Sequence, residues 1–86
     1  LALPEVNAIR ARAGVSALSS ITADQFLAER GREMFQEASR RTDLIRFGKW
    51  GDSWWEKTNS DSYRTIFPIP TEQLTANSNL QQNSGY

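Results

Sequence analysis

Two sets of small and apolar residues repeat at helical spacing, and they limit what this chain can fold into. Each set occupies positions i, i+4, i+7 and i+11, which line one narrow stripe of an α-helix. The first set is Ala2, Val6, Ile9 and Ala13, and the second is Leu27, Gly31, Met34 and Ala38. The sequence therefore predicts an all-α fold class, with narrow-faced helices in a helix–turn–helix unit.

Local signals set the ends of these helices. Pro4 is tolerated only near a helix start, and Gly14 suits the left-handed residue that follows a helix end. They predict a first helix over about 4–13. Thr22-Ala23-Asp24-Gln25 reads as a capping box and predicts a second helix over about 23–38. Inside it, Gly31 costs up to about 1 kcal/mol against alanine, so we expect a close approach to the backbone there.

The next apolar cluster, Leu44, Ile45 and Phe47, predicts a short helix over about 40–47 that Gly48 ends. The pattern leaves two alternatives open. This segment either continues the second helix after a bend near Ser39 or begins afresh.

The remaining residues have neither a helical nor a strand period. Residues 50–65 are rich in Asp, Ser and Asn and are predicted as a loop. Pro68 and Pro70 bias the residue before each of them toward extended geometry. Residues 66–86 are therefore predicted as an extended tail, in which Thr71 caps one last helical turn through Glu72 and Leu74.

Composition excludes several classes of function. The 86 residues include neither cysteine nor histidine, which removes Cys/His zinc sites, cysteine nucleophiles and histidine-based triads. Ten basic and ten acidic residues give no net charge, so no overall field attracts nucleic acid or an anionic membrane. No apolar run is as long as a membrane span, and no signal peptide opens the chain.

Three blocks carry a family resemblance: AIRARAG, then ERGREMFQEASRRTDLIRFGKW, then FPIP followed by NSNLQQNSGY. In this order and spacing the chain resembles the C-terminal segment of the SusD/RagB family, and the last block is the most specific. The resemblance implies a fragment of a mostly helical outer-membrane lipoprotein that uses no cofactor and is not an enzyme. Such a protein captures oligosaccharides at the surface of Gram-negative bacteria and delivers them to a TonB-dependent transporter.

The resemblance also implies details of this segment. The first helix would be the second helix of a TPR-like hairpin whose mate lies upstream, and the tail would wrap across the parent protein. Its expected anchors are Phe67, Leu80 and Tyr86. Family members often have arginine where this chain has Gly31 and glycine where it has Ala38. They are also several times longer and begin with a lipidated cysteine, so we expect 1–86 to be a C-terminal fragment of a SusD/RagB-like domain, with the anchor outside it.

Glu29, Glu33 and Glu37 stand one turn apart on one predicted helix face. Glycosidases use a pair of carboxylates as their catalytic groups, so a hydrolase has to be considered. Arginines at helix-surface spacing favour structural ion pairs instead, and they would lower carboxylate pKa values, which is wrong for a general acid. The pairs assigned in this way are Glu29 with Arg32, Arg30 with Glu33, Glu37 with Arg40 and Arg41, and Asp43 with Arg46.

A local excess of positive charge follows, formed by Arg40, Arg41, Arg46 and Lys49. It resembles a small nucleic-acid footprint. The balanced total charge and the absence of a nucleic-acid motif argue against that partner.

The residue types best suited to sugars lie in the predicted loop: Trp50, Trp54, Trp55 and Tyr63. Their flat faces can stack on the C–H faces of pyranose rings, which makes them the candidate glycan-binding residues of this chain. Because tryptophan is mostly buried on average, packing against the parent protein is favoured over that role. The function predicted from the resemblance is glycan capture. The alternative is a helical scaffold or interaction segment without a ligand, and a small glycosidase remains only if the glutamates are unpaired.

Overall fold

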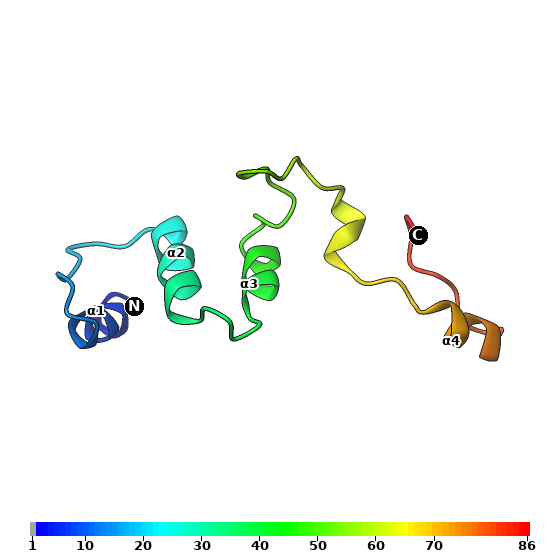
Figure 1. Cartoon of the computed structure of the whole chain (residues 1–86), viewed down its shortest axis with the longest axis horizontal. Coiled ribbons are helices and arrows are strands. Elements are labelled where there is room, and N and C mark those ends of the chain that lie inside the picture. Colours follow the sequence, from blue (N-terminus) through cyan, green and yellow to red (C-terminus); the bar gives the residue numbers. More distant parts are fainter. Residues whose placement is uncertain (1) are drawn as a thin grey trace. The chain divides into compact units, whose positions relative to one another are not determined.

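The computed structural model describes residues 2–86, and these residues form helices without any β-sheet. The elements are α1 (Leu3–Arg12), α2 (Ala23–Glu33), α3 (Arg40–Arg46), the 3-10 helix η1 (Ser62–Thr65) and α4 (Thr71–Ala76), and Figure 1 shows them in order. The predicted all-α fold class is confirmed. The chain divides into two compact units, one running to Phe47 and the other beginning at Gly48. We describe each unit separately.

Helix α1 has Pro4 in its first turn and ends in a Schellman motif. The Gly14 amide donates to the Ala11 carbonyl and the Val15 amide to the Arg10 carbonyl, each at 3.0 Å. Gly14 has a φ of 72°, which a residue with a Cβ adopts only at a cost. The helix thus ends where the sequence placed its stop signal, one residue before the predicted 13.

Helix α2 starts with the predicted capping box. The Thr22 hydroxyl accepts from the Gln25 amide, and the Gln25 side chain accepts from the Thr22 amide. The predicted end at 38 is wrong, because the helix stops at Glu33. Gln36 and Ala38 adopt left-handed backbone angles, with φ of 63° and 59°. The apolar period continues through this stretch in the sequence, but the packing of the next helix requires the chain to reverse.

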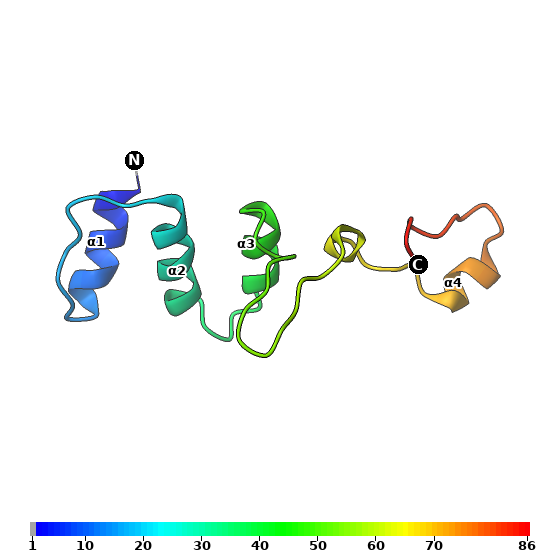
Figure 2. The same ribbon diagram turned by 90° about the horizontal axis from the view of Figure 1, so that it is seen from above.

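Helices α2 and α3 form an antiparallel helix–turn–helix pair (Figure 2). Phe26 near the start of α2 meets Phe47 after the end of α3, with ring centroids 6.2 Å apart. One turn further along α2, Arg30 bonds Asp43 at 2.9 Å. The contacting positions advance along α2, from Phe26 to Arg30, while they go back along α3, from Phe47 to Asp43. The two helices therefore run in opposite directions. The third helical segment therefore begins afresh and does not extend α2.

Helices α1 and α2 lie side by side and point the same way (Figures 1 and 2). Arg10 pairs with Glu29 and Arg12 with Glu33, so positions on both helices advance together. Residues 13–22 return along α1, where the Asn7 amide bonds both the N–H and the C=O of Leu18 at 2.8 and 2.9 Å. A TPR hairpin joins antiparallel helices, so the TPR-like role of α1 with an upstream mate stays a prediction.

The interior of the first unit is small. Within residues 2–86 the buried apolar side chains are Val6 and Leu27, each about 5 % exposed, and the one buried charged side chain is Asp43. Gly31 marks the expected close approach, which the side chain of Arg40 makes. A Cβ at Gly31 would lie 2.8 Å from Arg40 Nη1, and this nitrogen donates to the Leu27 carbonyl.

The second unit corrects two parts of the prediction. Residues 62–65 of the predicted loop form η1. The turn expected after Thr71 is the helix α4, but Pro70 and not Thr71 occupies its N-cap. Pro70 precedes α4 and its carbonyl accepts from the Gln73 amide, which starts a helix that needs no further apolar period. Among the described residues, none of the helices has the length and apolar character to span a bilayer.

Candidate functional site

The aromatic loop is built on a tight turn at residues 54–57. Trp54 and Lys57 exchange two backbone hydrogen bonds, of 3.1 and 2.9 Å, in an isolated antiparallel bridge. Glu56 completes the turn with a φ of 60°. Trp55 therefore stands at the tip, where its side chain is 84 % exposed. The turn holds a large apolar side chain in solvent, which is an uncommon place for tryptophan.

Lys57 closes one face of the neighbouring indole. Its Nζ lies 4.2 Å from the centre of the Trp54 ring, a cation–π contact. The same ammonium donates to the backbone carbonyls of Asp52 and Thr58, at 2.8 and 3.1 Å. Lys57 thus has an internal structural role in this turn.

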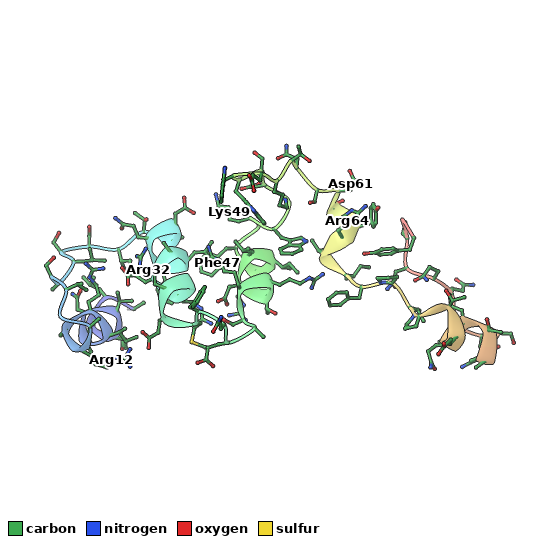
Figure 3. The ribbon with its side chains drawn as sticks, in the orientation of Figure 1. Arg12, Arg32, Phe47, Lys49, Asp61 and Arg64 are labelled. Atoms are coloured by element: carbon green, nitrogen blue, oxygen red, sulfur yellow. The ribbon has the colours of Figure 1, made fainter. Side chains whose placement is uncertain are left out.

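The other predicted aromatics have ring partners of their own. Trp50 and Trp54 meet edge to face, with centroids 6.4 Å apart. Tyr63 meets Tyr86 in the same manner at 4.9 Å, and the Arg64 guanidinium lies 5.1 Å from the Tyr63 ring. Figure 3 labels Arg64 at η1, the element that carries both residues. Of the four aromatics, Trp55 is the most exposed.

The extended segment 66–70 is held by side chains of the tail. The Gln82 amide bonds both the N–H and the C=O of Ile69, each at 2.8 Å. Asn83 Nδ2 donates to the Phe67 carbonyl and the Tyr86 hydroxyl to the Ile66 carbonyl, each at 2.7 Å. We call Gln82, Asn83 and Tyr86 the tail clamp. It supplies the hydrogen bonds that a neighbouring strand would otherwise give.

Gly85 brings the chain end against Tyr63. A Cβ at Gly85 would lie 2.4 Å from the Tyr63 ring, and its φ is 95°. The two other predicted anchors are exposed, Phe67 to 69 % and Leu80 to 40 %. Their expected anchoring on the rest of the parent protein therefore stays a prediction.

The glutamates of α2 are joined to arginines, mostly across helices. Glu29 Oε1 accepts from Arg10 of α1 at 2.5 Å and from Arg32 at 2.6 Å. Glu33 is bonded by Arg12 of α1 through both oxygens, at 2.6 and 2.7 Å. Figure 3 labels Arg12 and Arg32 on their two helices. These contacts lower the pKa of Glu29, first through its hydrogen bond with Arg32 and also through Arg10, although partial burial opposes them.

Several predicted ion pairs need correction. Arg30 bonds Asp43 instead of Glu33, and Arg40 donates to the Leu27 carbonyl instead of Glu37. In both cases the partner lies on the neighbouring helix, Asp43 on α3 and the Leu27 carbonyl on α2. Arg46 lies 3.9 Å from Asp43, the spacing expected of that pair. No ion pair joins Glu37 within residues 2–86.

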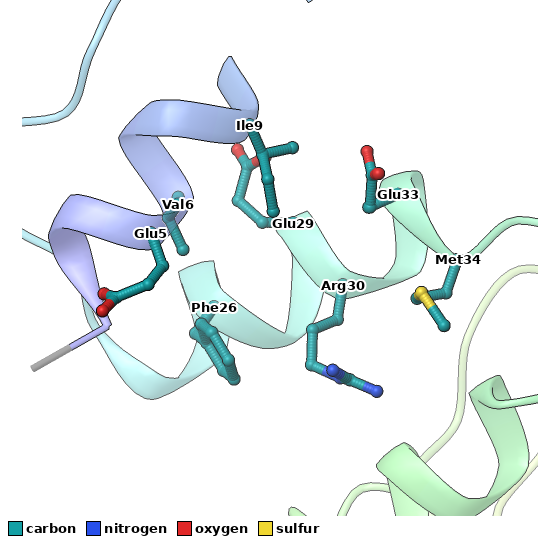
Figure 4. A pocket seen from close by; sticks show the side chains of 8 residues that line it. All are labelled: Glu5, Val6, Ile9, Phe26, Glu29, Arg30, Glu33 and Met34. Carbon is teal, nitrogen blue, oxygen red and sulfur yellow. The ribbon is translucent and has the colours of Figure 1, made fainter. Parts of the chain in front are cut away.

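A hollow of about 240 Å³ opens between α1 and α2. Figure 4 shows Val6 and Ile9 of α1 facing Phe26 of α2 across it, with charged side chains at its edge. The lining is mostly apolar, and Glu29 and Glu33 at its edge are engaged by arginines. Such a surface suits a packed side chain, and arginines hold two of its three carboxylates.

The basic residues of the first unit also have structural partners. Arg40 reaches a carbonyl and Arg46 approaches Asp43. Within residues 2–86, no cluster of acidic residues is placed to hold a metal ion.

Comparison with known proteins settles the family. Residues 2–64 match the SusD family. The chain belongs to this family. It is also 32 % identical over 92 aligned positions to the starch-binding protein SusD of Bacteroides thetaiotaomicron. That alignment includes 95 % of this chain but 17 % of the relative, so the chain spans about a sixth of that protein's length.

The name of this relative describes starch binding and no enzymatic reaction. The family match ends at residue 64, just before the extended segment, while the longer alignment continues through most of the chain. The resemblance read from the three sequence blocks is thereby confirmed.

Sequence reasoning missed the contacts that connect distant segments. The charge pattern of α2 indicated arginine partners for Glu29 and Glu33, but it did not point to Arg10 and Arg12 on another helix. The role of Lys57 at Trp54 was equally hidden. The tail is rich in Asn and Gln, whose side-chain amides can bond backbone groups, and the tail clamp is built in this way.

Proposed function

We propose that this SusD-family chain is part of a cell-surface lipoprotein of the outer membrane that captures oligosaccharides. The protein would pass them to a TonB-dependent transporter, and its lipid anchor would be at the N-terminus of the longer polypeptide. The chain would form part of the C-terminal segment of that polypeptide. Binding and transfer of a sugar require no cofactor and no catalytic residue.

One observation carries the proposal: nearly the whole chain aligns at 32 % identity with a protein named for starch binding. The aromatic loop agrees with it, because an exposed indole on a hydrogen-bonded turn is suited to stacking on sugar rings. The pairing of Glu29 and Glu33 with arginines supports binding without hydrolysis.

The test uses the full-length polypeptide that contains these residues. Isothermal titration against maltoheptaose, cellohexaose, xylohexaose and mannohexaose should reveal binding to at least one, with no release of shorter sugars. Affinity purification from the native outer membrane should recover a TonB-dependent transporter. If none of the four oligosaccharides binds, or if the bound one is hydrolysed, the proposal is wrong.

The hollow between α1 and α2 favours a second candidate, a scaffold segment without a ligand. Ile9 on its wall is 37 % exposed although it belongs to an apolar stripe. Under this candidate Ile9→Asp would lower the melting temperature of the full-length protein. The oligosaccharide affinity of the folded protein, measured below its melting temperature, would not change on substitution of any residue in 1–86.

A further inference from the structure

In the turn at 54–57, the indole of Trp55 is exposed to solvent, whereas Trp54 and Trp50 are in contact with other side chains. Trp54 is 47 % exposed, and the Lys57 ammonium lies over its ring. Trp50 is half-buried with its ring against Trp54. Trp55, at 84 % exposure, keeps its ring open to solvent.

The support beneath Trp55 is well ordered by hydrogen bonds. Two backbone bonds close the turn, and Lys57 Nζ ties it to the carbonyls of Asp52 and Thr58. The backbone of Ser60 bonds that of Gly51 at 2.9 Å and so closes the wider loop. A platform that is ordered in advance loses less conformational entropy when a ligand binds.

We infer that Trp55 is the sugar-stacking residue of this chain, and that Trp50, Trp54 and Lys57 position the turn that carries it. This inference rests on the proposed function, since the fold alone does not select a sugar over another apolar surface. The ligand class is an uncharged pyranose oligosaccharide. Its C–H face would cover the indole, while the exposed Glu56 carboxylate beside it can accept from a hydroxyl and would repel a phosphate or a uronic acid.

Substitutions in the full-length polypeptide test this role, with the oligosaccharide that wild type binds as the probe. Trp55→Leu keeps an apolar side chain but removes the flat ring, and it should weaken affinity about tenfold, an effect of about 1.4 kcal/mol. Trp55→Tyr keeps a flat ring and should stay within about threefold of wild type. The matched control is Phe35→Leu, because Phe35 is an aromatic of similar exposure (76 %) in the other unit. The oligosaccharide affinity of this variant should equal that of wild type.

The outcomes separate this inference from the proposed function. If wild type binds a sugar and Trp55→Leu binds it equally well, Trp55 has no stacking role while the proposed function stands. If Trp55→Leu lowers the melting temperature by several degrees, Trp55 packs against the rest of the polypeptide and the inference is again overturned. Failure of wild type to bind any oligosaccharide of the panel overturns both.

Discussion

At the scale of single residues, this chain uses side-chain amides as substitutes for a neighbouring strand. Asn7 bonds both backbone groups of Leu18, and Gln82 does the same for Ile69. A primary amide carries a donor and an acceptor side by side, so it can match the N–H and C=O of one extended residue. In each case a segment without regular structure becomes fixed to its own unit.

Gln82→Leu is expected to loosen the segment 66–70. The substitution leaves two partly buried backbone groups of Ile69 without their partner, a cost of about 1–3 kcal/mol. Amide hydrogen exchange at Ile69 in the full-length protein should become at least about tenfold faster. Gln81→Leu is the matched control, because Gln81 is exposed and adjacent, and it should leave this exchange rate unchanged.

The contact between α1 and α2 should weaken in acid through Glu29. Its pKa lies below the usual value of 4.5, chiefly because of Arg32 and also because of Arg10. A lowered pKa means that the folded state favours the charged form. The stabilisation is therefore complete above the usual pKa and is lost as the pH falls through the lowered one.

An NMR titration of the Glu29 carboxylate should show this lowered pKa directly. Glu29→Gln should reduce the loss of thermal stability that accompanies acidification below about pH 4.5. A titration midpoint at or above 4.5 would contradict the role assigned to the two arginines.

At the scale of elements, the α2–α3 pair depends on a buried carboxylate. Asp43 is about 1 % exposed and bonds Arg30, while Arg46 is more exposed and more distant. Asp43→Asn should lower the unfolding free energy by about 1–3 kcal/mol, because Arg30 loses its charged partner. Arg46→Ala should cost less than about 1 kcal/mol, as exposed ion pairs do. Urea denaturation of both variants measures the two losses of unfolding free energy. Equal losses would contradict the conclusion that the α2–α3 pair depends on the Asp43 carboxylate.

Deleting residues 76–86 should destabilise the parent protein without removing its sugar site. The deletion removes the tail clamp and the Tyr63–Tyr86 contact, together with the predicted anchors Leu80 and Tyr86. Each anchor side chain, if buried on the parent, contributes about 1.5–3 kcal/mol. A melting temperature that stays constant on deletion, with rapid proteolysis of the intact tail, would show that the tail is solvated.

The sequence predicted the helices of this chain better than it predicted which helices contact each other. The capping box at Thr22 and the glycine stop at Gly14 act within a few residues, so local pattern located them. The end of α2 was misplaced because left-handed turns at Gln36 and Ala38 serve the packing of α3, which no local signal reports. The same holds for the candidate site. The sequence shows its aromatic residues, but it does not show that the Lys57 ammonium covers one face of the Trp54 ring.

At the scale of the whole chain, the core is too small for an independent domain. Val6 and Leu27 are the buried apolar side chains of residues 2–86, while apolar residues such as Phe35, Trp55 and Phe67 are exposed. The isolated 86-residue chain should therefore have an unfolding free energy below about 5 kcal/mol, the lower end for natural domains. Urea denaturation measures it, with the full-length protein as the control. A cooperative transition above that value would show that the segment folds on its own.

The tail clamp has a consequence for how this protein avoids aggregation. Extended segments with free N–H and C=O groups recruit strands from other chains, which is the first step toward amyloid. Pro68 and Pro70 have no N–H to offer, and the N–H and C=O of Ile69 already bond Gln82. An apolar stretch that includes Phe67 and Ile69 can thus remain extended in the folded unit without serving as a template for intermolecular β-sheet.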